Sequence, residues 1–194
     1  SSSIHRLALL SELRQGLANR DLELRYQPVV DLRSGRVGRV EAVLRWRHDD
    51  DGTRLPVEFL ELAEHSGLIQ PLTRWTLGEA AAAARKLSSS DRPMVVSTNL
   101  SFRNLFDPDL LTFIGLLISS GELTPESVEL EVGETELMDD PVRAAEVLGQ
   151  LAELGVPVPD WAAVETEAEL QEFIDAHGGR AVVKTARGGY DGKG

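Results

Sequence analysis

The sequence contains no cysteine. This absence excludes a disulfide framework, thiolate metal sites and cysteine nucleophiles, and it suits the cytoplasm. Long apolar runs are also missing, because every apolar stretch is strand- or helix-sized and shorter than the about 20 residues that span a bilayer. The chain starts Ser1-Ser2-Ser3, without an initiator methionine or an apolar signal region. We therefore expect a cytoplasmic piece of a processed or longer protein, with no membrane partner.

Basic residues are scarce. There are 20 Lys and Arg against 32 Asp and Glu, a formal net charge of −12. This balance argues against binding polymeric nucleic acid, which requires many phosphates to be neutralised by Lys and Arg. A single nucleotide held through a metal ion remains compatible with it. The 42% hydrophobic and 27% charged residues are typical of a globular chain, and 194 residues are enough for one ordinary domain, or for one domain and a fragment.

Periodicity and turn residues predict a chain that begins helix, strand, strand and then alternates. A hairpin loop at residues 33–35 joins the first two strands. Strand and helix then alternate with a period of about 25 residues, which favours a parallel β/α architecture. The predicted strands are residues 22–31, 36–47, 94–100 and 127–132, and the predicted helices are residues 4–19, 57–65, 72–87, 108–119 and 141–154.

Several predicted strands have one apolar and one polar face. In the strand at 36–47, strict alternation separates the two sets. They are Val40, Ala42, Leu44 and Trp46 on one side and Arg39, Glu41, Val43, Arg45 and Arg47 on the other. If helices cover the apolar faces, the polar faces converge on the interior of a barrel. Glu41, Asn99 and Glu131 would then form an oxygen-rich cluster suited to magnesium, calcium or manganese. Antiparallel strands with one solvated face explain the same alternation, and this alternative stays open.

Four successive motifs carry a family resemblance. They are YQPVVD at 26–31, VEAVLRW at 40–46, STNLS at 97–101 and ELEVGE at 129–134. In order and spacing they resemble the EAL domains, the cyclic di-GMP phosphodiesterases of bacterial signalling. The resemblance covers residues 5 to about 155, and Val43 stands at the third position of the family's signature tripeptide.

This resemblance implies a TIM-like barrel whose first strand is antiparallel. It implies that Glu41, Asn99 and Glu131 bind magnesium or manganese, with Glu41 also catalytic, and that Gln27 and Arg45 contact cyclic di-GMP. Two ions would activate a water molecule against one phosphodiester and give linear pGpG. For Arg45, an ion pair within the sheet to Glu41 or Glu23 is the alternative.

The resemblance stops after residue 155. An EAL domain continues with paired aspartates and further carboxylates, whereas this chain has only Asp160, out of register. Carboxylates of this kind hold the second ion, so we expect hydrolysis to be absent or very slow. We expect an incomplete barrel whose exposed sheet edge pairs with a second copy of the chain.

The C-terminal segment resembles a different family, the ATP-grasp carboxyaminoimidazole ribonucleotide synthase, most clearly in VVKTARGGYDGKG at 182–194. It is expected to continue the fold as a β-α-β unit: an extended segment at 156–159, a helix opened by a capping box at 166–169, and a strand at 180–185. The resemblance implies an ATP contact by Lys184 and a phosphate loop formed by Gly188, Gly189, Tyr190, Asp191, Gly192 and Lys193. A flexible chain end is the alternative for this loop.

Together these features predict a chimera, with a partial EAL-type domain at 1–155 and an ATP-grasp-like fragment at 156–194. The leading functional hypothesis is an impaired cyclic di-GMP phosphodiesterase. The alternatives are a non-catalytic module that binds the dinucleotide or a partner protein, an ATP-binding ligase fragment, and a structural hybrid without a ligand.

Overall fold

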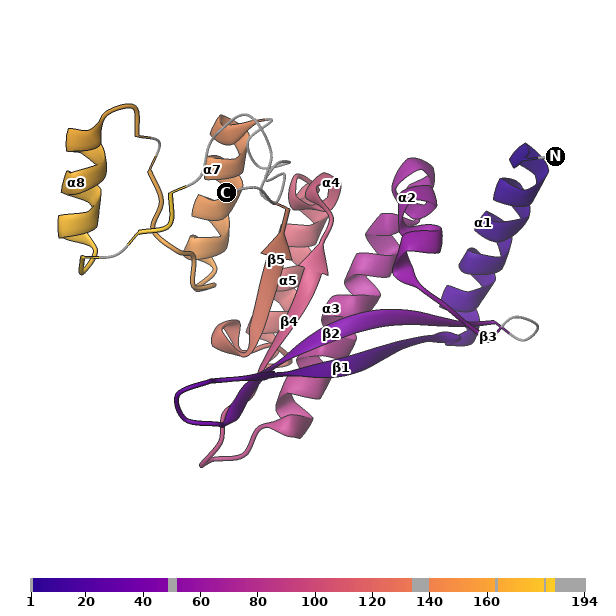
Figure 1. Cartoon of the computed structure of the whole chain (residues 1–194). Helices are drawn as coiled ribbons and strands as arrows, with labels where there is room; N and C mark the ends of the chain where they lie inside the picture. The colour runs from indigo at the N-terminus through magenta and orange to yellow at the C-terminus, as the bar shows by residue number, and fades with distance from the viewer. Residues whose placement is uncertain (1, 49–51, 134–139, 163, 180, 184–194) are drawn as a thin grey trace.

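The computed structural model describes residues 2–48, 52–133, 140–162, 164–179 and 181–183 (Figure 1). The strands are β1 (Leu22–Val30), β2 (Val37–His48), β3 (Gly52–Arg54), β4 (Val95–Leu100) and β5 (Val128–Val132). The helices are α1 (Ser2–Asn19), α2 (Pro56–Ser66), α3 (Ile69–Leu87), α4 (Phe102–Leu105), α5 (Pro108–Ser119), α7 (Pro141–Glu153) and α8 (Glu167–Ala176), with a short 3-10 helix η1 (Pro125–Ser127).

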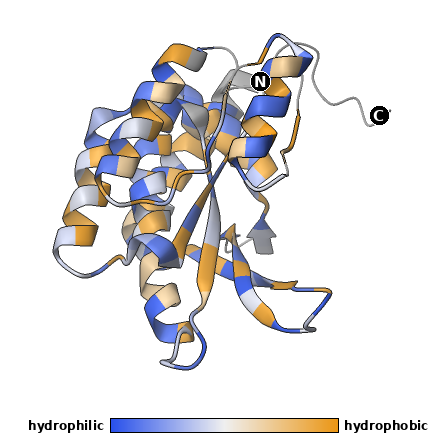
Figure 2. Ribbon diagram, turned by 90° about the vertical axis from the view of Figure 1, so that its left-hand side faces the viewer, coloured by the Kyte–Doolittle hydropathy of each residue, from blue (hydrophilic) through white to orange (hydrophobic). Residues whose placement is uncertain are grey.

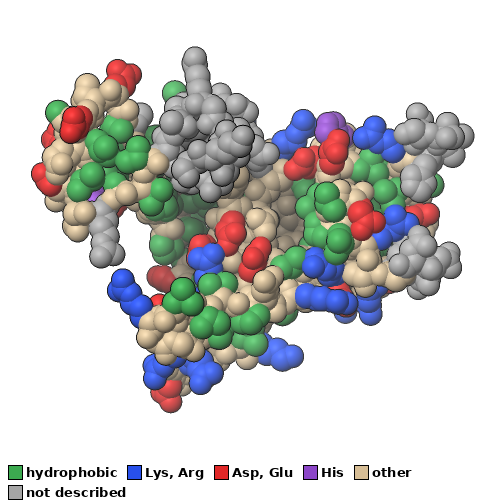
Figure 3. All heavy atoms as spheres, viewed as in Figure 1, with side chains coloured by type: hydrophobic (Ala, Val, Ile, Leu, Met, Phe, Trp, Pro, Cys, Tyr) green, Lys and Arg blue, Asp and Glu red, His purple; other side chains and the backbone are tan. Residues whose placement is uncertain are grey.

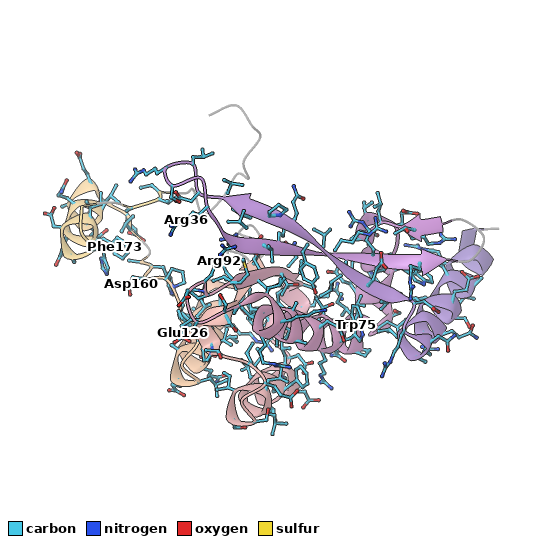
Figure 4. All side chains as sticks on the ribbon, turned by 90° about the horizontal axis from the view of Figure 1, so that it is seen from below. Arg36, Trp75, Arg92, Glu126, Asp160 and Phe173 are labelled. Atoms are coloured by element: carbon cyan, nitrogen blue, oxygen red, sulfur yellow. The ribbon has the colours of Figure 1, made fainter. Side chains whose placement is uncertain are left out.

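The sheet is mixed and open among the described residues. Its strand order is β1-β2-β4-β5. The short strand β3 pairs with the C-terminal end of β2, on the edge opposite β1. β1 runs antiparallel to β2, whereas β2, β4 and β5 are parallel. Helices α3 and α5 lie behind the sheet in Figure 1 and below it in Figure 4. The predicted hairpin and parallel strands are therefore confirmed, and among the described residues the sheet does not close into a barrel.

The alternation along β2 separates a helix-covered face from a polar face. Val40, Ala42, Leu44 and Trp46 are all buried, and the residues between them are only half-buried. Figure 2 shows the same alternation of hydrophobic and hydrophilic residues along the hairpin. The buried face packs in two clusters, one against α3, α5 and α7 and one against α1, α2 and the start of α3. Burial of this face against helices leaves the polar face of the sheet to build a site.

The hairpin loop is closed by Asp31. One of its carboxylate oxygens accepts hydrogen bonds from the backbone N–H of Arg33 at 3.0 Å and of Ser34 at 2.7 Å, and from the Ser34 hydroxyl at 2.8 Å. These hydrogen bonds, those from Ser34 first, hold the pKa of Asp31 below its usual value. Gly35 supplies a positive φ of 67° in the same turn. The local sequence thus fixes the antiparallel first strand.

The C-terminal segment corrects one prediction. The capping box is confirmed, because Thr166 and Glu169 cap the first turn of α8. The expected β-α-β unit is wrong in its strands, since residues 156–159 and 181–183 join no sheet. Pro157 and Pro159 have no N–H to donate to a ladder, and Val182 is 84% exposed, without the packing that a sheet strand needs. The rest of the strand expected at 180–185 lies outside the described residues.

In the part of the chain that the structure describes, no helix is both long and apolar enough to cross a membrane.

Gly16 allows α1 to approach β2. A Cβ added at Gly16 would lie 2.8 Å from Nε1 of Trp46, which is itself only 2% exposed. We expect Gly16→Ala to lower the free energy of unfolding in urea by about 1–3 kcal/mol, because the indole cannot move out of a packed core. The control is Gly149→Ala in α7, where nothing lies within 4 Å of the added Cβ. It should gain up to about 1 kcal/mol of helix propensity. Equal effects of the two substitutions would contradict the close contact.

Candidate metal and nucleotide site

Glu41 and Asn99 meet on the polar face of the sheet. The parallel register pairs Glu41 of β2 with Ser97 of β4, which places Asn99 two residues further along on the same face. The Nδ2 of Asn99 donates a hydrogen bond of 3.3 Å to Oε1 of Glu41. Two of the three predicted ligands are therefore in direct contact, and the contact leaves the amide oxygen of Asn99 available as a ligand.

Glu131 lies on the next strand, where β5 pairs it with Asn99. Its Oε1 accepts a hydrogen bond of 2.7 Å from Nη2 of Arg39. The Nη1 of the same arginine donates to both carboxylate oxygens of Glu129, at 2.8 and 2.9 Å. Figure 3 shows acidic side chains beside a basic one over β4 and β5. The three predicted ligands thus come from adjacent strands and one face, with Glu131 ion-paired to Arg39.

The residues predicted to contact the dinucleotide lie on the same hairpin. Gln27 of β1 pairs in register with Glu41 and is exposed. Arg45 is half-buried, and its Nη1 donates to the backbone oxygen of Leu44 at 2.8 Å. Glu23 forms its ion pairs with other arginines, at 2.9 Å and 3.9 Å. Among the described residues no ion pair joins Arg45 to Glu23 or Glu41, so the alternative interpretation of Arg45 is wrong.

The donor set fits one hard divalent cation. Glu41, Asn99 and Glu131 offer two carboxylates and an amide oxygen, the ligand chemistry that magnesium and manganese prefer. Within the described ranges, no group of three or more His, Cys, Asp or Glu side chains has metal-binding geometry. Any set of three side-chain donors at this face of the described residues therefore includes the amide of Asn99.

Asp160 does not replace the missing aspartates. Its carboxylate lies 3.6 Å from Nε2 of His177, and its side chain is 77% exposed. Figure 4 shows Asp160 beside the α8 region that carries Phe173, away from the sheet. The ring of Phe173 stacks on His177 at a centroid distance of 4.1 Å. Asp160 therefore belongs to the C-terminal segment and not to the site on the sheet.

A cavity that the sequence did not reveal adjoins Asn99. Register pairing of β2 with β4 ends at Ala42 and Thr98. A space of about 250 Å³ lies beyond this pair, between the two strands and helices α2 and α3. One wall carries Glu64, whose Oε1 accepts a 2.7 Å hydrogen bond from the hydroxyl of Ser101. The sequence pattern gives no sign of this space, because it opens only where β2 and β4 diverge beyond their last paired residues.

A buried asparagine fixes the loop that follows β4. Asn104 of α4 is 2% exposed, and its Nδ2 donates to the backbone oxygen of Ile69 at 3.2 Å and to the hydroxyl of Thr73. These bonds hold α4 against α3 directly after the strand that carries Asn99. Asn104 consequently supports the position of the site without touching its oxygens.

A model of the EAL domain family matches residues 10–158. The chain belongs to the EAL domain family. The match covers all three oxygen donors and both residues predicted to contact the nucleotide.

Curated relatives support the same family assignment. The chain is 34% identical over 151 residues to the cyclic di-GMP phosphodiesterase PA2567 of Pseudomonas aeruginosa, an overlap of 77% of this chain and 26% of that protein. It is 36% identical over 150 residues to an uncharacterized signaling protein of Caulobacter vibrioides, covering 77% of this chain and 18% of the relative. This EAL chain thus spans well under two thirds of these relatives.

Solved EAL structures share the fold. The PaMucR phosphodiesterase in complex with c-di-GMP has a TM-score of 0.71 at 35% identity, over 77% of this chain and 61% of that one. The FimX EAL domain from Pseudomonas aeruginosa bound to c-di-GMP has a TM-score of 0.66 at 26% identity, over 75% and 58%. These neighbours are TIM-like barrels with a mixed sheet and helices, which confirms the expected fold class for the EAL part.

An ATP-grasp domain model matches residues 149–194. The match is short, and the relatives reported above do not corroborate it. Lys184 and the loop residues Gly188, Gly189, Tyr190, Asp191, Gly192 and Lys193 lie outside the described residues. ATP binding therefore stays a prediction from the sequence alone.

We expect Asn104→Ala to lower the free energy of unfolding by about 1–3 kcal/mol, because the Ile69 carbonyl and the Thr73 hydroxyl lose their buried partner. Urea denaturation followed by circular dichroism measures the change. The control is Asn19→Ala at the exposed end of α1, which should stay within about 0.5 kcal/mol of the parent. If both variants behave alike, the buried hydrogen bonds of Asn104 do not anchor α4.

Proposed function

We propose that this EAL domain binds cyclic di-GMP together with a magnesium or manganese ion on the polar face of β2, β4 and β5. The observation that carries the proposal is the contact between Glu41 and Asn99, with Glu131 in register beside them. The family supports it, because EAL phosphodiesterases depend on these divalent ions. The solved relatives in complex with c-di-GMP support the ligand class.

In this proposal Glu41, Asn99 and Glu131 hold the cation, which when bound polarises a phosphodiester and lowers the pKa of a water molecule. The Asn99 amide orients the Glu41 carboxylate through the 3.3 Å hydrogen bond. Arg45 offers planar N–H donors to a phosphate from the same face of β2. Gln27, exposed and in register with Glu41, contacts the dinucleotide from β1.

We further propose that hydrolysis to pGpG is impaired. A two-metal mechanism needs carboxylates for the second ion. The paired aspartates expected after residue 155 have no counterpart in the sequence, and the Asp160 carboxylate lies 3.6 Å from His177 in the C-terminal segment. The proposal is therefore a dinucleotide-binding domain with little or no phosphodiesterase activity.

The domain boundary belongs to the same proposal, with a partial EAL-type unit at 1–155 and a fragment at 156–194. Helix α7 ends at Glu153, and Gly155 turns the chain with a φ of 83°. Val156 and Val158 then pack against the edge of the larger core. The residues after the turn thus cover the EAL unit without extending its sheet.

Binding is tested by calorimetric titration of the whole chain with cyclic di-GMP, with and without manganese. We expect binding that manganese strengthens at least about tenfold, and loss of that strengthening in Glu41→Gln, because the variant removes a charged ligand. Glu126→Gln, on the exposed 3-10 helix η1, is the matched control and should bind like the parent. Binding that manganese and Glu41→Gln leave unchanged would contradict the site.

Turnover is tested on the same protein by chromatography for pGpG after incubation with cyclic di-GMP and manganese. We expect binding without substantial product, because the carboxylates for a second ion are absent from the described site. Rapid, Glu41-dependent release of pGpG would show that the domain is a competent phosphodiesterase and would overturn the proposed impairment.

We expect the chain to self-associate through the outer edge of β5. No strand of the described residues pairs with that edge, and unpaired edges readily accept another strand. We expect light scattering to show a concentration-dependent dimer. Ser127→Pro or Val128→Pro cannot separate pairing from folding, so the test is amide hydrogen exchange in β5, which should slow as the dimer forms with rising concentration. A monomer at all concentrations would contradict pairing through β5.

A further inference from the structure

Arg39 links two strands that do not touch each other. It belongs to β2, whereas both of its acceptors, Glu129 and Glu131, belong to β5, and β4 lies between these strands. Its Nη1 lies 2.8 Å from Glu129, and its Nη2 lies 2.7 Å from Glu131. The guanidinium therefore crosses the face of β4 to reach a residue of the proposed cation site.

The residue beneath this crossing is Ser97. It is fully buried at 0% exposure, although it lies on the polar face of β4, and it pairs in register with Glu41 on one side and Glu129 on the other. Neither its Oγ nor the buried Nε of Arg39 has a hydrogen-bond partner in the structure. Only the two terminal nitrogens of Arg39 make polar contacts, and both contacts are to carboxylates.

We propose that Arg39 competes with the divalent cation for Glu131 and thereby sets the metal affinity of this domain. The inference rests on the proposed function, in which Glu131 is a ligand. In the metal-free protein the guanidinium neutralises Glu131. A cation can use that carboxylate fully only when Nη2 releases it, since otherwise two positive charges share the same carboxylate.

Glu129 makes this release feasible. It holds Nη1 through both carboxylate oxygens, so Arg39 keeps a charged partner after Nη2 leaves Glu131. The three side chains are partly exposed, at 38% for Arg39, 45% for Glu129 and 33% for Glu131. Ion pairs with this much solvent access are weak enough to exchange. Arg39 is therefore a positioning residue. Glu129 holds it in place, and Glu131 is the carboxylate for which it competes with the cation.

A purely structural role is the competing explanation, in which Arg39 only braces β2 against β5. The two explanations predict opposite signs. If Arg39 only braces the sheet, removing it loosens the site and lowers the affinity for the cation. If Arg39 competes, removing it raises the affinity for the cation, even where the metal-free protein becomes slightly less stable.

The experiment is titration of the whole chain with manganese alone, followed by electron paramagnetic resonance of the free ion, with thermal melting of the metal-free protein in parallel. We expect Arg39→Gln to bind manganese about tenfold more tightly and Glu129→Gln to bind it more weakly, because Arg39 then has only Glu131 as a partner. In the double variant the Glu129 effect should disappear, since it acts through Arg39. Arg39→Lys, which lacks the two-pronged geometry, should fall between the parent and Arg39→Gln.

Unchanged or weaker manganese binding in Arg39→Gln, with Glu131→Gln still losing affinity, would overturn the role of Arg39 and leave the proposed site intact. Equal binding by the parent and Glu131→Gln would show that Glu131 is not a ligand, and it would overturn both proposals. A Glu129 effect of the same size in the parent and in the Arg39→Gln background would show that Glu129 acts by its own charge and would contradict the competition.

Discussion

The parallel register of β4 between β2 and β5 is the constraint on which the rest of the structure depends. It sets Glu41 beside Ser97 and Asn99 beside Glu131, so that oxygen donors from separate strands share one face. A slip of one residue would turn all of these side chains toward the helices. The apolar residues on the opposite face make such a slip costly, because Val40, Ala42 and Val96 would lose their burial against α3. The hydrophobic core thus positions the polar site.

The same face holds opposing charges in balance. Glu41, Glu129 and Glu131 would repel one another if they stood alone, and Arg39 supplies the compensating positive charge across β4. This arrangement stabilises the sheet without a metal ion. The same contact occupies Glu131, a proposed ligand, with the guanidinium of Arg39. Stability of the empty site and affinity of the filled site are therefore linked through one side chain.

Sequence reasoning predicted those features that depend on local patterns. Two-residue alternation in β2, the hairpin loop at 33–35 and the Thr166 capping box are confirmed by the structure. It failed where the outcome depends on distant partners. Periodicity places the helix at 4–19 but does not fix its rotation: Leu9 and Leu13 are buried whereas Leu7 is 68% exposed, and Gly16 is the position that lies against Trp46. Residues 181–183 of the strand expected at 180–185 join no sheet, because a strand needs a neighbour placed beside it, and the sequence pattern does not specify that neighbour. The contact of Arg39 with β5 required knowledge of the register across three strands.

The central claim is that Glu41, Asn99 and Glu131 share one divalent cation. The most direct measurement is a crystal structure of the chain soaked in manganese, with the ion located by its anomalous scattering. The account predicts one peak within bonding distance of an oxygen from each of the three side chains. A peak elsewhere, or no peak at this face in manganese-saturated crystals, would contradict it.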